Sequence, residues 1–334
     1  EEPFFYAATL ITEQPFVSNN ADNYQPSISP NGKTLAFIED RRTLKVMDLD
    51  TLKTTVLIRP ENMLHMRDGD QTFSWSPDSE WILFEYDKLL NNADIAMVHV
   101  SGEQDIRVIV PSGYYDASPK WVNQGKQIIW FSNRSGLRSY ATSGRSQNDV
   151  YSLFLTQADW DKFSLSEDDY ELLQAIETAA EEKTEKETEK ETESDKVGDD
   201  DNIASEEVVV IKPIEIEWDD IDDRTSKLTI HSSILADAVL NKDATKLYYL
   251  SRFEDQFDLW ETDLRTKDTS KTISLGSSGG NLIWDRDMET LYLLSDGSIT
   301  KLLVEEGSSE NVTISGKVII DQDALRQHSF DHVW

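Results

Sequence analysis

The sequence of 334 residues contains no cysteine. This absence excludes disulfide bonds, metal sites held by thiolates and a cysteine nucleophile. It does not separate cytoplasm from periplasm, because a chain without thiols is compatible with either redox environment.

Basic residues are also scarce. The chain has 32 Lys and Arg against 64 Asp and Glu, which gives a formal net charge of −32, and its pI is near 4.4. A surface of this sign repels the phosphates of nucleic acids and of anionic lipids. The charge therefore argues against nucleic acid and against an anionic membrane as partners.

Long hydrophobic runs are missing as well. No stretch approaches the roughly 20 apolar residues that span a bilayer. The opening residues, Glu1-Glu2-Pro3, contain neither an initiator Met nor a basic-then-apolar signal, so we expect a chain trimmed at its start. The length allows two ordinary domains, but a repeat array grows by adding units, which favours a single domain over residues 1–334.

A short phrase recurs along the chain. It is clearest as Ser-Ile-Ser-Pro-Asn-Gly-Lys-Thr-Leu-Ala-Phe at residues 27–37, and it returns at residues 74–84 and 120–130. The equivalent turn positions lie 47 and 46 residues apart, and are Gly32, Ser79 and Gly125. A period in the forties indicates one supersecondary unit that is used several times.

Each copy is an apolar strand, a turn rich in Pro, Asn, Asp or Gly, and a second apolar strand, which is the pattern of a β-hairpin. A third and a fourth strand follow, at residues 44–49 and 54–58 in the first copy and at residues 95–100 and 106–110 in the second. Four antiparallel strands per repeat predict an all-β fold, a β-propeller of four-stranded blades. A β-sandwich would not need the repeat.

Tryptophan recurs at one strand position in three copies, as Trp75, Trp121 and Trp284. A large apolar side chain repeated at one place in a blade is expected to pack between neighbouring blades. We therefore interpret these tryptophans as core residues and not as a platform for sugars.

Two later copies, at residues 240–249 and 284–293, have lost the turn phrase but keep the apolar positions, with Ala244 and Met288 at the turn. The third and fourth copies are separated by one repeat plus roughly 70 extra residues. We assign the excess to an acidic insertion within one blade, residues 157–211. The five copies and the strand-like residues 4–11 suggest six blades, or part of seven.

The insertion contains a predicted helix that starts at Ser166, since a serine cap followed by acidic residues suits a helix N-terminus. Residues 183–193 alternate Glu, Lys and Thr with nothing to bury, which predicts a disordered segment or a frayed exposed helix. A solvated insertion is the favoured interpretation, and a docking tail for a basic partner or a calcium-binding segment is the alternative. Asp199-Asp200-Asp201 lacks the spacing of an EF-hand loop.

The loop at residues 132–149 places three arginines in an otherwise acidic protein. Guanidinium groups bind carboxylates well. If the loop faces the propeller channel, its residues could hold the carboxyl end or an acidic side chain of a peptide, and the candidate substrate-binding residues are Arg134, Arg138, Tyr140 and Arg145. The alternative is that one or more of the arginines pair with an aspartate of a blade.

The sequence predicts no catalytic residue, no metal site and no cofactor. Of the five histidines, His328 and His332 have a four-residue spacing, but no Glu is placed between them as a base and we expect a strand or tail there, so zinc is not supported. An enzyme acting on glycans would need convergent carboxylates, for which Asp116, Asp219 and Asp285 are available.

The repeat at residues 29–37 resembles the propeller repeat of TolB and of tricorn-type proteases. Two further segments are more specific: residues 130–136, continuing to 149–153, and residues 216–224, followed by Lys227-Leu228-Thr229. This pair, split by a charged insertion, resembles the second propeller of bacterial tricorn-like serine proteases of the S41 class. The closing residues 330–334 resemble the exit from that propeller.

The resemblance implies an accessory propeller that guides or filters unfolded peptides toward PDZ and protease domains absent from this chain, in a parent that could be oligomeric. It implies a periplasmic or exported bacterial protein, with a cytoplasmic location as the alternative. The other function we consider is a free-standing TolB-like module that binds another protein.

Overall fold

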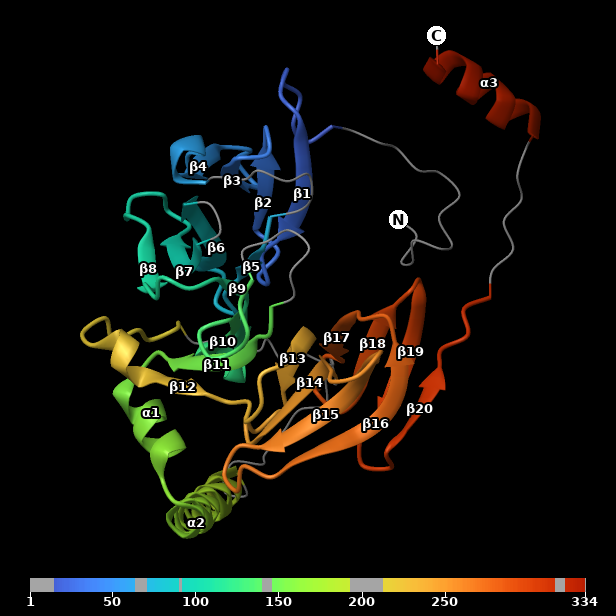
Figure 1. Ribbon diagram of the computed structural model, residues 1–334. Helices are drawn as coiled ribbons and strands as arrows, with labels where there is room; N and C mark the ends of the chain where they lie inside the picture. Colours follow the sequence, from blue (N-terminus) through green and yellow to red (C-terminus); the bar gives the residue numbers. More distant parts are fainter. Residues whose placement is uncertain are drawn as a thin grey trace.

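The computed structural model describes residues 15–63, 71–89, 92–139, 146–192, 213–315 and 322–333. Within these ranges the fold is all-β, with five four-stranded antiparallel sheets that follow the chain order. Figure 1 shows the sheets arranged one after another around an arc, with the first and the fifth at its two ends. The strand-like residues 4–11 lie outside the described residues.

We number the sheets 1 to 5. Sheet 1 contains β1 (Asn23–Ile28), β2 (Thr34–Glu39), β3 (Thr43–Asp48) and β4 (Thr54–Ile58). Sheet 2 contains β5 (Phe73–Trp75), β6 (Trp81–Leu89), β7 (Asn92–His99) and β8 (Arg107–Val110). Sheet 3 contains β9 (Asp116–Val122), β10 (Gln127–Ser132), β11 (Asp149–Phe154) and β12 (Thr225–Lys227).

Sheet 4 contains β13 (Ile234–Leu240), β14 (Lys246–Arg252), β15 (Phe257–Asp263) and β16 (Thr269–Ser277). Sheet 5 contains β17 (Asn281–Trp284), β18 (Leu291–Ser295), β19 (Ser298–Leu303) and β20 (Ser308–Asn311). The hairpins and the third and fourth strands predicted for the first two copies are therefore confirmed.

The hairpin turns keep one backbone geometry even where their sequence has changed. The five equivalent turn residues all have positive φ, at +72°, +67°, +86°, +54° and +57° for Gly32, Ser79, Gly125, Ala244 and Met288. In four copies the side chain of the first turn residue accepts a hydrogen bond from a backbone N–H four or five residues later in the chain. These residues are Ser29, Ser76, Asn241 and Asp285. The turn is thus specified by a capping side chain as well as by glycine.

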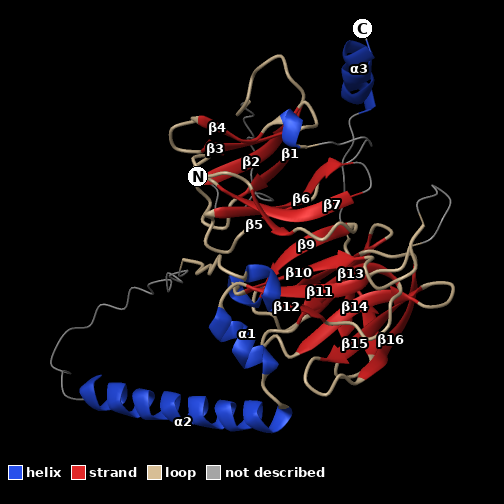
Figure 2. Ribbon diagram, turned by 60° about the vertical axis from the view of Figure 1, so that its left-hand side comes forward, coloured by secondary structure: helices blue, strands red, loops and turns tan. Residues whose placement is uncertain are grey.

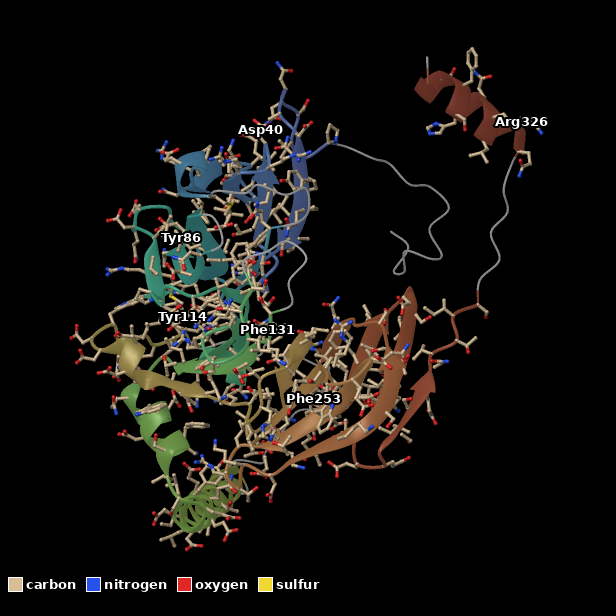
Figure 3. The ribbon with its side chains drawn as sticks, viewed as in Figure 1. Asp40, Tyr86, Tyr114, Phe131, Phe253 and Arg326 are labelled. Carbon is tan, nitrogen blue, oxygen red and sulfur yellow. The ribbon has the colours of Figure 1, made fainter. Side chains whose placement is uncertain are left out.

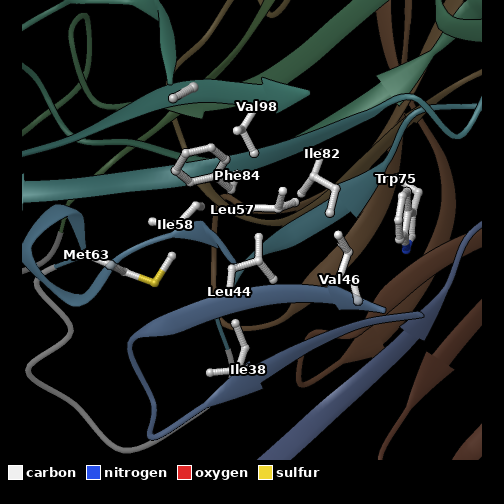
Figure 4. Packing of buried hydrophobic residues seen from close by; sticks show 12 residues of the cluster. Ile38, Leu44, Val46, Leu57, Ile58, Met63, Trp75, Ile82, Phe84 and Val98 are labelled. Carbon is white, nitrogen blue, oxygen red and sulfur yellow. The ribbon is translucent and has the colours of Figure 1, made fainter. Parts of the chain in front are cut away.

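Four hydrophobic clusters hold the sheets together, and each lies between two consecutive sheets. Figure 4 shows the first, where Leu44, Ile58 and Phe84 meet between sheets 1 and 2. Trp75 is buried in this cluster, and Trp121 and Trp284 pack at the edges of two others, which confirms their prediction as packing residues. Interior sheets are covered on both faces, as in β10, where all six residues are buried.

The insertion separates the third and fourth strands of sheet 3, since β11 pairs with β12 across it. It begins with a helix that the sequence analysis missed, α1 (Gln157–Ser164), whose Trp160 and Phe163 pack on Phe154. The chain returns to sheet 3 through residues 213–224. There the buried Arg224 donates to the carbonyl oxygens of Phe154 (3.1 Å) and Asp219 (3.0 Å), and so joins the two ends of the insertion.

Helix α2 (Glu167–Thr192) follows α1 and extends away from the sheets (Figure 2). Its predicted cap is confirmed, because the N–H of Asp169 donates to Ser166 Oγ at 3.2 Å. The helix continues through Lys183 to Thr192, so of the two alternatives for this stretch the structure has the helix. Asp199-Asp200-Asp201 lies outside the described residues.

A last helix, α3 (Gln322–Val333), contains His328 and His332, so the expectation of a strand or tail there is wrong. None of the described helices is both long enough and apolar enough to cross a bilayer.

Candidate functional site

The arginine-rich loop leaves sheet 3 at the end of β10. Ser132 pairs with Asp116 at the start of β9 and with Asp149 at the start of β11, so the loop lies at the edge of the sheets where their first strands begin. We call this edge the entry rim. Figure 3 labels Tyr114, which precedes β9, and Phe131, near the end of β10. The structure describes residues 133–139 and 146–148 of the loop, and Tyr140 and Arg145 lie outside the described residues.

The two described halves of the loop are held close together. The N–H of Gln147 donates to the carbonyl of Leu137 at 2.8 Å. A Cβ atom on Gly136 would lie 2.2 Å from the carbonyl oxygen of Gln147, a distance that no real side chain tolerates. A glycine at position 136 is therefore needed for this approach.

Arg134 is used inside sheet 3. Its Nη2 lies 3.4 Å from Asp116 Oδ1, its Nε donates to Ser132 Oγ at 3.1 Å, and its guanidinium lies 4.5 Å from the centre of the Tyr151 ring. Asp116 is fully buried and also accepts a hydrogen bond from Trp130 Nε1 at 2.9 Å. A buried carboxylate needs such a partner. Arg134 thus pairs with an aspartate of its own blade, and its contact with a peptide stays a prediction.

Arg138 is placed differently. Its side chain is exposed, and its guanidinium lies 4.9 Å from the centre of the Tyr114 ring. No ion pair joins it to a carboxylate within the described part of the chain. A cation over an aromatic face keeps its N–H donors directed toward solvent, where they can donate to a ligand carboxylate. Of the two arginines that the structure describes in this loop, Arg138 is the one left without a carboxylate partner, and its contact with a ligand stays a prediction.

A second acidic residue lies beside this site. Asp94, at the start of β7, accepts the backbone N–H of Ser112 at 3.3 Å. Burial raises the pKa of Asp94 above its ordinary value, and the nearby Asp116 carboxylate raises that pKa further. Negative charge is therefore disfavoured just inside the rim, while Arg138 and Tyr114 lie at its surface.

The sequence analysis missed Tyr114 and Asp94. The signal for Tyr114 was present, since two tyrosines precede the first strand of this blade, but only the fold brings position 114 beneath the side chain at position 138. Asp94 belongs to the preceding sheet, and no local spacing links it to the loop.

The structure does not bring together the three carboxylates that were available for a glycan-acting enzyme. Asp116 lies at the entry rim, whereas Asp285 caps the turn between β17 and β18 at the opposite end of its sheet. Asp219 is exposed in the return segment of the insertion. Within the described ranges no group of three His, Asp or Glu side chains has metal-binding geometry.

Comparisons with known proteins give the fold. No family model matches the chain. The crystal structure of the tricorn protease matches 89% of the chain with a TM-score of 0.57 and 14% identity, and the structure of a TolB from Agrobacterium tumefaciens matches 89% with a TM-score of 0.50 and 12% identity. The chain has the β-propeller fold that these two structures share. Its five described sheets are blades of that fold.

The sequence of the propeller is 28% identical over 107 residues to a tricorn-like protease C-terminal subunit of Sulfurisphaera tokodaii, a match that covers 32% of the propeller chain. The propeller spans 12% of that relative and 26% of the tricorn protease chain, whereas it spans 82% of the Agrobacterium TolB. It is therefore a small part of its protease relatives.

Proposed function

We propose that this chain is a non-catalytic β-propeller domain that guides or filters peptides toward the protease core of a tricorn-like serine peptidase. The observation that supports it most is that an aligned sequence segment and the fold of nearly the whole chain point independently to tricorn proteins. In this proposal the protease activity belongs to a protease core that follows a PDZ domain outside the chain, and the protein works in the periplasm or is exported, with the cytoplasm as the alternative.

The entry rim supplies the peptide contact. Arg138 is an exposed cation on an aromatic support in a chain of net charge −32, so it supplies the local positive charge that a peptide carboxylate needs on a surface that otherwise repels anions. Arg134 fixes the start of the loop through Asp116, which limits the movement of Arg138.

A free-standing TolB-like module that binds another protein is the second candidate. It is favoured by how much of each compared protein this chain covers, which is 82% of the Agrobacterium TolB but only 26% of the tricorn protease chain. The two candidates differ in the ligand, which is an unfolded peptide in the first and a folded protein in the second.

The deciding experiment measures hydrolysis of casein by this chain and by the full product of its gene, together with binding of fluorescein-labelled unfolded peptides by fluorescence anisotropy. We expect hydrolysis only by the full product and peptide binding by both. Hydrolysis by this chain alone would contradict a non-catalytic role. A full product that neither hydrolyses casein nor binds peptides would favour the TolB-like module.

The role of the rim is tested with one peptide that carries either a free or an amidated carboxyl end. Arg138→Ala should weaken binding of the free form several-fold and leave the amidated form unchanged. Arg286→Ala is the matched control, because Arg286 is also exposed but lies in the turn between β17 and β18, at the end of sheet 5 opposite the entry rim. Equal loss for both peptide forms would show that Arg138 does not read the carboxylate.

A further inference from the structure

The entry rim brings the end of the arginine-rich loop beside the start of sheet 4. Asn148, at the end of the loop, exchanges two backbone hydrogen bonds with Ser233, at 2.7 and 3.0 Å. Ser233 comes just before β13, and its Oγ accepts a hydrogen bond from Ser251 Oγ of β14 at 2.7 Å. The loop that carries Arg138 is therefore continuous with the rim of sheet 4.

Three large apolar side chains are exposed around this junction. The exposed fractions are 69% for Leu137, 41% for Ile230 and 45% for Phe253. Leu137 is next to Arg138 in the loop, and its carbonyl accepts the N–H of Gln147 at 2.8 Å. We call Leu137, Ile230 and Phe253 the rim patch.

The register of the strands limits the distances within the rim patch. Ile234 pairs with Arg252, so Phe253 lies opposite Ser233 where the two strands begin and end. Ile230 precedes Ser233 by three residues. With about 3.3 Å per residue along a chain and about 4.8 Å between paired strands, the Cα atoms of the rim patch lie within roughly 15 Å of Ser233. The last four residues of an extended peptide cover about 13 Å, which matches this span.

Phe253 is held in place although it is exposed. Its ring lies 4.8 Å from the ring of Trp260 in a T-shaped arrangement (Phe253 is labelled in Figure 3). A ring that is already restricted by a neighbour loses little side-chain entropy when a ligand binds. Phe253 is therefore a preformed contact for an apolar side chain of a ligand.

The polar residues around the rim patch define the charge of its ligand. Glu254 and Asp255 lie in the turn after β14 and are exposed, and so is His231, which is next to Ile230. The two carboxylates on the sheet 4 side repel an acidic residue of a ligand, whereas Arg138 on the sheet 3 side offers donors to a carboxylate. Exposed apolar residues surrounded by polar ones are typical of an interaction surface.

We propose that the rim patch binds the large apolar side chains that precede the free carboxyl end of an unfolded peptide, while Arg138 binds the carboxylate. The substrate class is therefore peptides whose carboxyl-terminal segment is apolar and carries no acidic side chain. This inference rests on the proposed function and deepens it, because it adds a side-chain preference to the carboxylate contact.

Charge argues against two other occupants of the rim patch. A second copy of the chain brings a formal charge of −32 and is repelled. A basic segment is attracted by Glu254 and Asp255, but it is repelled by Arg138 and leaves the apolar side chains uncovered. A peptide with a free carboxylate and uncharged apolar side chains suits each part of the surface.

The side-chain preference is tested with fluorescein-labelled peptides that share one Gly-Ser body and differ only in their carboxyl-terminal residues. These residues are Leu-Phe-Leu, Ser-Gly-Ser or Lys-Ser-Lys, and each peptide is made with a free and with an amidated end. Fluorescence anisotropy measures their binding to the whole chain. We expect the free Leu-Phe-Leu peptide to bind about tenfold more tightly than the free Ser-Gly-Ser peptide, because apolar side chains are buried.

Variants assign the preference to the rim patch. Phe253→Ser and Leu137→Ser should each remove most of it and leave binding of the Ser-Gly-Ser peptide unchanged. Phe253→Ser should also weaken binding of the amidated Leu-Phe-Leu peptide, whereas Arg138→Ala should not, since the amide lacks the carboxylate. Leu52→Ser is the matched control, because Leu52 is 55% exposed but lies in the turn between β3 and β4 of sheet 1. It should keep the full preference.

The outcomes separate this inference from the proposed function. If free peptides bind through Arg138 with one affinity whatever their last side chains, the inference is overturned and the proposed function stands. Tightest binding of the Lys-Ser-Lys peptide, or equal losses in Phe253→Ser and Leu52→Ser, would also overturn the inference. No binding of any peptide would contradict both. Self-association that Phe253→Ser abolishes in sedimentation velocity would assign the rim patch to a second copy and overturn the inference.

Discussion

The indole Nε1 of Trp75 donates a hydrogen bond to the backbone carbonyl of Ser27 at 3.1 Å, and this bond joins the first strands of sheets 1 and 2 across 48 residues of chain. Trp284 repeats the arrangement between sheets 5 and 4, where its Nε1 donates to the carbonyl of Leu240 at 2.7 Å. At these two positions the tryptophan therefore does more than fill space, since it ties its blade to the backbone of the one before.

The contribution of the Trp75 Nε1 hydrogen bond to stability can be measured separately from that of the packing of the ring. Trp75→Phe should lower the free energy of unfolding by about 1 to 3 kcal/mol, from the lost bond and the reduced packing. Trp121→Phe is the matched control, because the buried Nε1 of Trp121 has no hydrogen-bond partner among the described residues, and its loss should be smaller. Urea denaturation measures both, and equal losses would contradict a role for the Nε1 bond.

The eroded turns are sites for stabilisation. Met288 has a φ of +57°, which costs a non-glycine residue about 1 kcal/mol or more. Met288→Gly should therefore raise the free energy of unfolding by several tenths of a kcal/mol, since relief of strain exceeds the entropy that glycine adds to the unfolded chain. Asp287→Gly, one residue earlier and not at positive φ, should lower stability. The same sign for both variants would refute this account.

The insertion is fastened to sheet 4 by Arg265. Its guanidinium donates to the carbonyl oxygens of Lys162 (2.9 Å), Phe163 and Leu165 (3.1 Å), and lies 4.0 Å from the centre of the Tyr170 ring. Arg265→Lys keeps the charge but cannot reach three carbonyls with one planar fork.

We therefore expect Arg265→Lys to increase hydrogen exchange in α1 and the first turns of α2 roughly tenfold, while exchange in sheets 1 and 2 is unchanged. Arg286→Lys, at an exposed arginine in the turn between β17 and β18 of sheet 5, should leave exchange in both regions as it was. Unchanged exchange in α1 would show that the aromatic cluster of Phe154, Trp160 and Phe163 holds the insertion without Arg265.

Two carboxylates should respond to pH with opposite signs. The pKa of Asp94 is raised by burial, so its charge destabilises the folded state once the pH rises above the ordinary value of 3.8. Asp94→Asn should therefore stabilise the protein at neutral pH, and the gain should disappear below pH 3.8.

The pKa of Asp285 is lowered from 3.8, chiefly by the N–H of Glu289, so its charge stabilises the folded state at neutral pH and this contribution is lost as the pH falls through the lowered pKa. Asp285→Asn should lower stability at neutral pH and have no effect in stronger acid. Urea denaturation across the acid range measures both variants, and profiles of the same sign would contradict these assignments.

Much of the fold follows from local chemistry. The turn phrase defines where hairpins form, and Ala244 and Met288 could be placed at turns from apolar spacing alone, even though their side chains do not favour positive φ. Ser166 predicts its helix because a cap acts within one turn. Helix α1 escaped prediction because its aromatic residues gain stability from Phe154 in a sheet, and this contact has no local signature.

The candidate site was predicted less completely. A cluster of arginines in an acidic chain is visible in the sequence, but the environment of each one is not. Arg134 and Arg138 are four residues apart in one loop, yet one pairs with a fully buried aspartate and the other is exposed over a tyrosine. The partners, Asp116 and Tyr114, come from the preceding strand region and reach the loop only after the sheet has formed.

The repeat, the four-stranded unit, the turn positions and the insertion can be predicted from the sequence, because these depend on residue spacing and on backbone preferences within a few residues. Contacts formed in the folded protein set which tryptophans bond to a carbonyl and which arginine stays exposed. These outcomes depend on contacts between blades, where residues about 45 positions apart meet, and spacing along the chain does not encode which atoms will face each other there.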